Sequence, residues 1–185
     1  MTYANCLLDS PADVAAMAVG IAPVSGLYRV RLATEPWELR AYARLRYQVF
    51  CLEQGLFPDG DADEHDAVAQ AIVAVSSATV ADDDVVGTVR IHAASNGVWL
   101  GSRLAVDPAW RGVPNLAASL IRCAVCTAHA RGCRTFLANV QRQNVPLFRR
   151  LNWRSLGELD VCGRAHHLMQ ADLRFYPPAS APSPA

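Results

Sequence analysis

The segment Trp99–Trp153 decides the fold of this chain, and it reads WLGSRLAVDPAWRGVPNLAASLIRCAVCTAHARGCRTFLANVQRQNVPLFRRLNW. Its first part, residues 99–106, is mostly apolar and rich in residues typical of β-structure, so it predicts a strand. The Asp107–Pro108 pair ends that strand, because a proline pushes the residue before it out of the helical region.

The middle of the segment predicts a long helix that follows a short turn at 111–114, with Asn115 as its N-cap. One face of this helix carries the apolar residues Leu116, Leu120, Ala124 and Ala128. Arg131–Gly132 ends the helix, because a cation suits its last turn and glycine suits a left-handed cap. A strand over 135–140 and a short helix over 146–151 follow, so the segment predicts a β-α-β unit.

The remaining elements are predicted from the same local patterns. They are an alanine-rich helix over 11–20, an edge strand over 27–32, a helix over 37–50 opened by Pro36, and strands over 71–75 and 85–92.

The turn before the long helix is a candidate anion site. The first turn of a helix leaves amide groups unpaired, and the helix dipole favours negative charge there. Arg111 in the turn would strengthen the binding of a phosphate. The same pattern also fits a β-α-β unit with a purely structural role.

Length and composition limit the class of protein. With 185 residues the chain suits one domain, which we expect at 26–176, between an N-terminal extension (1–25) and a disordered tail (177–185). Charged residues make up 18% and the formal net charge is zero, which argues against a general nucleic-acid binder because such proteins carry a basic excess. We recognise no membrane span or secretion signal, so we expect a cytoplasmic protein that binds no membrane.

The six cysteines do not predict a disulfide framework or a metal site. Cys123 and Cys126 form a C-x-x-C within the predicted helix, without a second pair at zinc-site spacing. Cys162, His166 and His167 lack an evident fourth ligand. We therefore expect reduced thiols packed as small hydrophobic residues, and no metal.

The segment 99–153 resembles the core of the GCN5-related N-acyltransferases, the GNAT fold. The motifs that carry the resemblance are L-A-V-D-P, then R-G-V-P-N-L-A at the place of R-x-x-G-x-G/A, and later N-x-x-L-F-x-x-L-x-W. The resemblance extends over about 27–175 and implies an α/β fold with a mixed, twisted sheet of six or seven strands flanked by helices. It also implies that acetyl-CoA or another acyl-CoA enters between the strands that start at Trp99 and Thr135.

The same resemblance implies which residues hold coenzyme A. Main-chain amides of the turn and of the first helical turn would bind the pyrophosphate, and an amide near Val106 would polarise the thioester carbonyl. The implied site comprises Leu104, Ala105, Val106, Arg111, Gly112, Val113, Asn115, Leu116, Ala117, Asn144 and Phe148.

Two residues depart from the family pattern. Pro114 replaces the glycine of R-x-x-G and has no amide proton, which removes one donor, at a cost of about 1–3 kcal/mol in binding. Phe148 replaces the tyrosine that often protonates the departing thiolate. Coenzyme A can still leave as a thiolate, because a thiol pKa of roughly 8.5 makes it a tolerable leaving group.

The segment from Arg46 to Asp66 resembles ElaA-like acetyltransferases and, more loosely, acyl-homoserine-lactone synthases. The shared patterns are R-x-x-V-F-x-x-E-Q and D-x-x-D, and in both families the segment borders the acceptor site. The resemblance implies that Glu53 orients an amine or accepts its proton through water, with a pKa that close packing would raise. The acids at 61–66 alone also fit a solvated loop.

Three polar residues of the predicted strands are candidates for binding the acceptor. Arg90 lies in a G-x-x-R pattern typical of the third GNAT strand, and it is either a salt-bridge former on the sheet or a cation in the acceptor site. Ser102 and Arg103 on the next strand leave the same choice open, and an S-R at this place also occurs in the lactone synthases.

The last informative stretch is G-x-x-H-x-x-M at 163–169, which resembles the ElaA-like ending and places His166 on the family's histidine. A histidine titrates near neutral pH and can serve as a general base. A histidine that only caps a hairpin fits the same pattern.

Together these patterns predict an acyl-CoA-dependent N-acyltransferase that acts on a small-molecule amine by direct attack in a ternary complex. Glu53 and His166 are the candidate catalytic residues, and we expect no nucleic acid or metal, with a homodimer as the candidate assembly. E-Q-G-L-F, D-x-D-E-H-D and H-A-R-G-C most resemble the nitrogen-starvation acetyltransferases encoded beside nitrilases. The alternatives are a non-catalytic module that binds coenzyme A or a partner, and an acyl-homoserine-lactone-like synthase.

Overall fold

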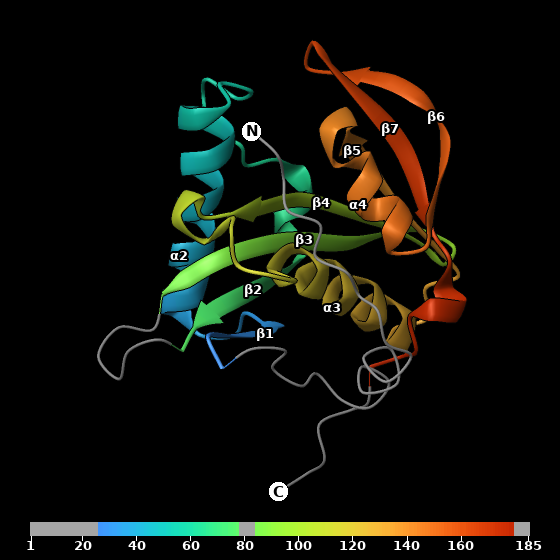
Figure 1. The fold of residues 1–185 in the computed structure, drawn as a ribbon, viewed down its shortest axis with the longest axis horizontal. Coiled ribbons are helices and arrows are strands. Elements are labelled where there is room, and N and C mark those ends of the chain that lie inside the picture. The colour runs from blue at the N-terminus through green and yellow to red at the C-terminus, as the bar shows by residue number, and fades with distance from the viewer. Residues whose placement is uncertain (1–25, 78–83, 180–185) are drawn as a thin grey trace, which may run out of the picture.

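A computed structural model of the chain describes residues 26–77 and 84–179, in which a seven-stranded mixed sheet carries helices on both faces (Figure 1). The strand order is β1-β2-β3-β4-β5-β7-β6, so the predicted mixed sheet is confirmed and β1 is the predicted edge strand. The strands are β1 (Tyr28–Leu32), β2 (Gln70–Ser76), β3 (Val85–Ser95), β4 (Val98–Val106), β5 (Thr135–Gln141), β6 (Trp153–Val161) and β7 (Arg164–Ala171). The helix predicted over 11–20 and most of the predicted tail lie outside the described residues.

Three α-helices flank the sheet: α2 (Pro36–Arg46), α3 (Leu116–Ala130) and α4 (Val145–Arg150). The helix predicted over 37–50 continues beyond its predicted end, because α2 runs on as a π-helix, η1 (Tyr47–Glu53). An apolar pattern with a period of 3.6 residues cannot signal this wider winding. No helix among the described residues is both long and apolar enough to cross a membrane.

The sheet separates two hydrophobic cores, as the alternation along β2 shows. Ile72 and Ala74 belong to a core that includes residues of α3, whereas Val73 and Val75 belong to a smaller core with residues of α2 and η1. Successive side chains of a strand point to opposite faces, so α3 and α2 cover opposite faces of the sheet. All residues of β2 from Ile72 to Ser76 are buried, as expected for a strand covered on both sides.

Tight turns close the two hairpins that flank the centre of the sheet. Asn96 and Gly97 between β3 and β4 both have positive φ, at 34° and 82°, and Cys162 and Gly163 between β6 and β7 have 52° and 71°. Positive φ at both central residues matches the twist of the strands on either side.

The start of α3 differs from the prediction in one detail. Asn115 does precede the helix, but it adopts a left-handed conformation (φ 62°) and its side chain makes no capping hydrogen bond. The predicted N-cap position is therefore confirmed, but its side chain does not cap, because an N-cap side chain reaches the first-turn amides from an extended backbone. At the other end Gly132 has φ 85°, and the predicted glycine cap is confirmed.

Candidate functional site

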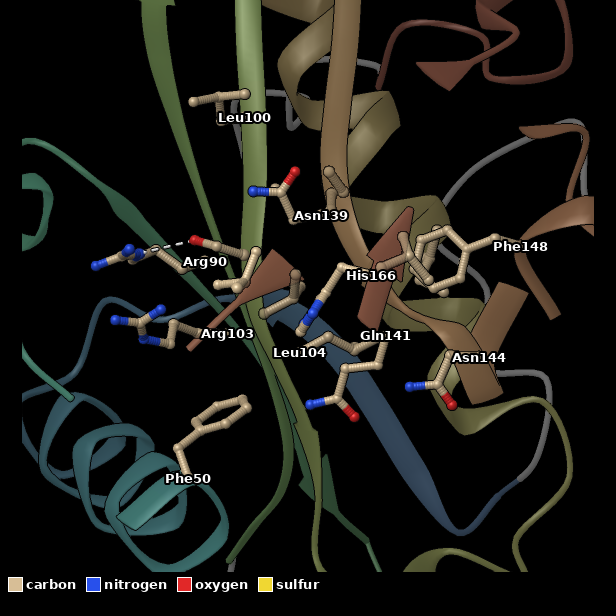
Figure 2. A pocket seen from close by; sticks show the side chains of 18 of the residues that line it. Phe50, Arg90, Leu100, Arg103, Leu104, Asn139, Gln141, Asn144, Phe148 and His166 are labelled. Carbon is tan, nitrogen blue, oxygen red and sulfur yellow. Dashed lines mark hydrogen bonds between the residues drawn. The ribbon is translucent and has the colours of Figure 1, made fainter. Parts of the chain in front are cut away.

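A cavity of about 350 Å³ opens where β4 and β5 separate (Figure 2). The two strands pair in parallel only from Val98–Thr135 to Gly101–Ala138, although both continue beyond that point. The cavity is lined by Phe50, Gln54, Leu56, Phe57, His65, Val89, Arg90, His92, Leu100, Gly101, Ser102, Arg103, Leu104, Ile121, Ala124, Phe136, Ala138, Asn139, Val140, Gln141, Asn144, Phe148, Trp153, Val161, Cys162 and His166.

A β-bulge in β4 accompanies this separation. Thr88 pairs with Ala105 and Arg90 with Ser102, so β4 holds one residue more than β3 between the two pairs. Arg103, inside the bulge, has φ 55°. A bulge bends its strand and increases its twist, which accounts for the departure of β4 from β5 after Gly101.

His166 lies on β7 at the wall of this cavity and is 7% exposed. Its Nδ1 is 2.8 Å from the main-chain oxygen of Arg164. A carbonyl oxygen can only accept, so Nδ1 carries a proton, and in the neutral form of the ring Nε2 then carries the lone pair. The ring extends toward Leu104 and Gln141 (Figure 2), which places a proton acceptor beside the separated strands.

Three arginines and three aspartates form a network at the α2 side of the cavity. Arg46 bonds to Asp61 at 2.7 Å and to Asp66 at 2.6 Å, and Arg90 bonds to Asp63 at 2.6 and 2.8 Å. Arg103 contacts Asp61 at 3.1 Å and Asp63 at 3.2 Å. The three aspartates of the stretch that also fitted a solvated loop are therefore paired with arginines, and two of these arginines, Arg46 and Arg90, are buried. Glu64 of the same stretch is 84% exposed and pairs with no arginine among the described residues.

Hydrogen bonds in this network hold Asp63 and Asp66 in their charged form. Burial tends to raise the pKa of Asp66, but bonds from Arg46, the Asp63 amide and Arg90 outweigh it, and the pKa lies far below its ordinary value. The hydrogen bond from Arg90 likewise lowers the pKa of Asp63. Asp63 and Asp66 are thus charged partners of the arginines, and Arg90 acts in the network as a buried ion-pair former rather than as a free cation.

Glu53 is held by Arg111 and does not line the cavity. The two side chains form parallel hydrogen bonds of 2.8 and 2.5 Å, and they are 39% and 45% exposed. The expectation of a raised pKa for Glu53 is wrong, because the hydrogen bond from Arg111 lowers it. Arg111 also donates to the main-chain oxygen of Val106 at 3.2 Å.

The other residues implied for coenzyme A divide between two places. Leu104, Asn144 and Phe148 line the cavity, and Phe148 is buried with its ring 4.9 Å from that of Trp153 in an edge-to-face arrangement. The rest lie along the end of β4 and around the start of α3, outside the cavity lining. These are Ala105, Val106, Arg111, Gly112, Val113, Asn115, Leu116 and Ala117.

Sequence reasoning missed several polar residues of the cavity. Gln141 on β5 donates to the side chain of Gln54 at 3.0 Å, which joins β5 to the residue after η1, and Asn139 also lines the cavity. His65 and His92 line it as well. The sequence could have indicated His92, because it lies two residues from Arg90 in a predicted strand, and side chains two residues apart in a strand share a face.

Comparisons with known proteins agree with this architecture. Residues 45–103 match the family model described as "Acetyltransferase (GNAT) domain". A protein of Lactobacillus plantarum superposes with a TM-score of 0.68 at 20% identity, over 78% of this chain and 97% of that one. No curated protein matches the sequence of this chain.

Two further solved structures have a similar fold. Escherichia coli ElaA gives a TM-score of 0.65 at 19% identity, over 78% of this chain and 98% of its own. An acyl-CoA N-acyltransferase from Pseudomonas aeruginosa gives 0.59 at 18% identity, again over 78% and 98%. At these identities the likeness shows the fold, and the chain has the GNAT fold.

Proposed function

We propose that this chain is an acyl-CoA-dependent N-acyltransferase that transfers an acyl group, most simply acetyl, to a small-molecule amine. The observation that carries the proposal is the opening between β4 and β5, with the lone pair of His166 Nε2 at its wall. Such an opening gives a thioester access to an unpaired strand edge and gives an amine a neighbouring proton acceptor.

The residues around the opening fit a thioester with a diphosphate tail. Beyond Gly101, the edge of β4 has no ladder partner on β5, so amides of residues up to Val106 are candidates for polarising the thioester carbonyl. The turn at 111–114 is largely exposed and leads into the first-turn amides of α3, which suit a pyrophosphate except at Pro114. Acyl-coenzyme A, when bound, would supply the activated acyl group, and coenzyme A would be its leaving group.

In the proposed mechanism the amine nitrogen attacks the thioester carbonyl directly, in a ternary complex. A main-chain amide near Val106 stabilises the charge that develops on the carbonyl oxygen. His166 Nε2 accepts the proton that the nitrogen loses, and the carbon–sulfur bond breaks. Phe148 has no proton for the departing sulfur, which leaves as a thiolate. Holding amine and thioester together contributes most of the acceleration.

Glu53 acts in the proposed mechanism through its ion pair with Arg111. Its carboxylate is engaged by that guanidinium, so its proposed role is to orient the turn or a bound amine at the cavity rim. On the side of the cavity proposed for the acceptor amine, Arg90 and Arg103 hold the loop aspartates in place through their ion pairs. Ser102 provides a hydroxyl group on the same side.

We also propose membership of the nitrogen-starvation acetyltransferase subfamily on the motifs E-Q-G-L-F and H-A-R-G-C. A non-catalytic module that binds coenzyme A is the second candidate. It is favoured by Phe148, which is buried against Trp153 and provides no acid near the opening.

The test compares two neighbouring histidines in a thiol-release assay with acetyl-CoA and a panel of small amines. His166→Ala should lower turnover by roughly 10²–10⁴ and leave the affinity for coenzyme A nearly unchanged. His167→Ala is the matched control, because that ring bonds to the Ser155 hydroxyl at 2.9 Å and does not line the cavity. Equal turnover of wild type and His166→Ala would remove His166 as the base. Coenzyme A binding without turnover of any amine would favour the non-catalytic module.

A further inference from the structure

His92, on β3, is a buried polar residue of the cavity wall that has no partner. Its side chain lines the cavity, is 4% exposed, and neither ring nitrogen makes a hydrogen bond with any described residue. The ring stacks on that of His65, which also lines the cavity, with 4.4 Å between centroids and 14° between planes. A buried imidazole without partners costs stability, so its hydrogen-bonding groups require an explanation.

The charged group next to His92 on this wall, the Arg90 guanidinium, already has its partners. The Arg90 guanidinium donates to Asp63 and Asp66 and, through Nε, to the Ser102 hydroxyl oxygen at 3.0 Å, the dashed bond in Figure 2. The Ser102 hydroxyl therefore accepts from a cation, and its own proton has no acceptor among the described residues. Ser102 and His92 thus remain able to bind a ligand.

The register of the sheet brings these two side chains to one face. His92 pairs with Leu100, and Ser102 lies two residues farther along β4, so the two side chains are diagonal neighbours about 7–8 Å apart at their Cβ atoms. His166 lies on β7, three strands from β3, and pairs with Gln141 beyond the point where β4 and β5 separate, so it lies farther from His92 than the roughly 14 Å that three strand spacings span. A single ligand that reaches both histidines must therefore be elongated.

The charge around this pair favours a neutral ligand group. The adjacent network balances three arginines with three aspartates, which leaves no uncompensated charge for a carboxylate or an ammonium group. Burial, His65 and Arg90 all lower the pKa of His92, so its ring is neutral at neutral pH. A neutral imidazole offers one N–H donor and one nitrogen acceptor.

We propose that His92 and Ser102 form a subsite for the far end of the acceptor amine, which carries a neutral group that both donates and accepts hydrogen bonds, a carboxamide or a hydroxyl. The inference rests on the proposed function, because the other end of the same molecule presents its amine to His166. It narrows the substrate class to elongated amines with a polar, uncharged tail.

The test measures binding of matched amines to protein saturated with coenzyme A, by calorimetry, so that no turnover is required. The probes are ω-amino carboxamides, ω-amino alcohols, ω-amino carboxylates and alkylamines in which an isopropyl group replaces the carboxamide, each in several chain lengths. The carboxamide or the alcohol should bind about tenfold or more tightly than the isopropyl isostere, and their comparison decides between the two neutral groups.

Substitution of His92 connects this preference to the ring. His92→Phe keeps an aromatic ring against His65 and removes both nitrogens, so it should bring the ratio of affinities close to one without changing coenzyme A affinity. His92→Asn, which retains a donor and an acceptor, should keep part of the preference. The melting temperature of His92→Phe should not fall, because no hydrogen bond is lost.

The inference is overturned by equal binding of all tails, by a preference that His92→Phe leaves intact, by tightest binding of the carboxylate, by no amine binding, or by a marked loss of stability in His92→Phe. Failure of the proposed function would instead appear as no binding of coenzyme A by the wild-type protein, or as no turnover of any amine in the thiol-release assay.

Discussion

The ion pair between Glu53 and Arg111 predicts that removing a carboxylate tightens the binding of coenzyme A. In the proposed complex Arg111 serves a phosphate, yet in this structure both of its terminal nitrogens bond to Glu53. Binding therefore requires Arg111 to exchange or share its partner. Glu53→Gln keeps the shape of the side chain and removes the charge that holds the guanidinium.

The exposure of the pair sets the size of the effect. The two side chains are 39% and 45% exposed, so solvent screens them, and such pairs contribute about 0.2–1 kcal/mol. Breaking the ion pair consumes this free energy when coenzyme A binds, so its removal in Glu53→Gln should tighten coenzyme A binding by up to about fivefold. Because the hydrogen bond from Arg111 lowers the pKa of Glu53, the carboxylate stays ionised at neutral pH, and the gain should be constant across about pH 6–8.

Calorimetric titration with coenzyme A at matched low salt measures the effect. Arg111→Ala should weaken binding by about 1–3 kcal/mol, and Glu53→Gln should add little in that background because no guanidinium remains to be released. Asp59→Asn is the charge-matched control, since Asp59 is exposed and forms no ion pair with the described residues. Unchanged or weaker binding by Glu53→Gln, or the same gain in Asp59→Asn, would refute the competition.

Three further outcomes follow from the structure. Arg90→Leu removes one of the two buried arginines of the network and leaves three aspartates with two arginines, so it should lower the free energy of unfolding by about 3–5 kcal/mol, measured by denaturant titration. Because the folded-state pKa of Asp66 is depressed, its contribution to stability is full above about pH 4 and is lost as the pH falls further. Asp66→Asn should therefore be less stable at neutral pH and show a shallower acid transition in melting temperature, and an unchanged acid profile would contradict this. Titration of the unfolded, unreduced protein should find six thiols, including Cys123, whose pKa burial raises to about 11, and Cys126; fewer would indicate a disulfide.

The β-α-β unit could be predicted from the sequence because its signals are local. The apolar period of α3, the strand-forming residues of β4 and β5, and the Arg131–Gly132 ending all depend on residues within a few positions of one another. The motifs of segment 99–153 added the GNAT fold, which the seven-stranded sheet and the structural neighbours confirm.

The partners of the charged and polar side chains were decided only by the tertiary structure. Glu53 and Arg111 are separated by 58 positions in the sequence, and no local pattern predicts their contact. The acids at 61–66 fitted a solvated loop as well as a site, and only the packing of α2 against β3 and β4 supplied their arginines.

The shape of the cavity has the same origin. An arginine with positive φ in the bulge of β4 has no local sequence signal, because glycine and asparagine are the residues that favour that conformation. The sequence by itself determined strands β1 to β5 and helices α2, α3 and α4, since backbone conformation responds to neighbouring residues. Only the assembled sheet decided the separation of β4 from β5 and the burial of His92 without a hydrogen-bond partner in the described part of the chain, because both depend on how distant strands meet.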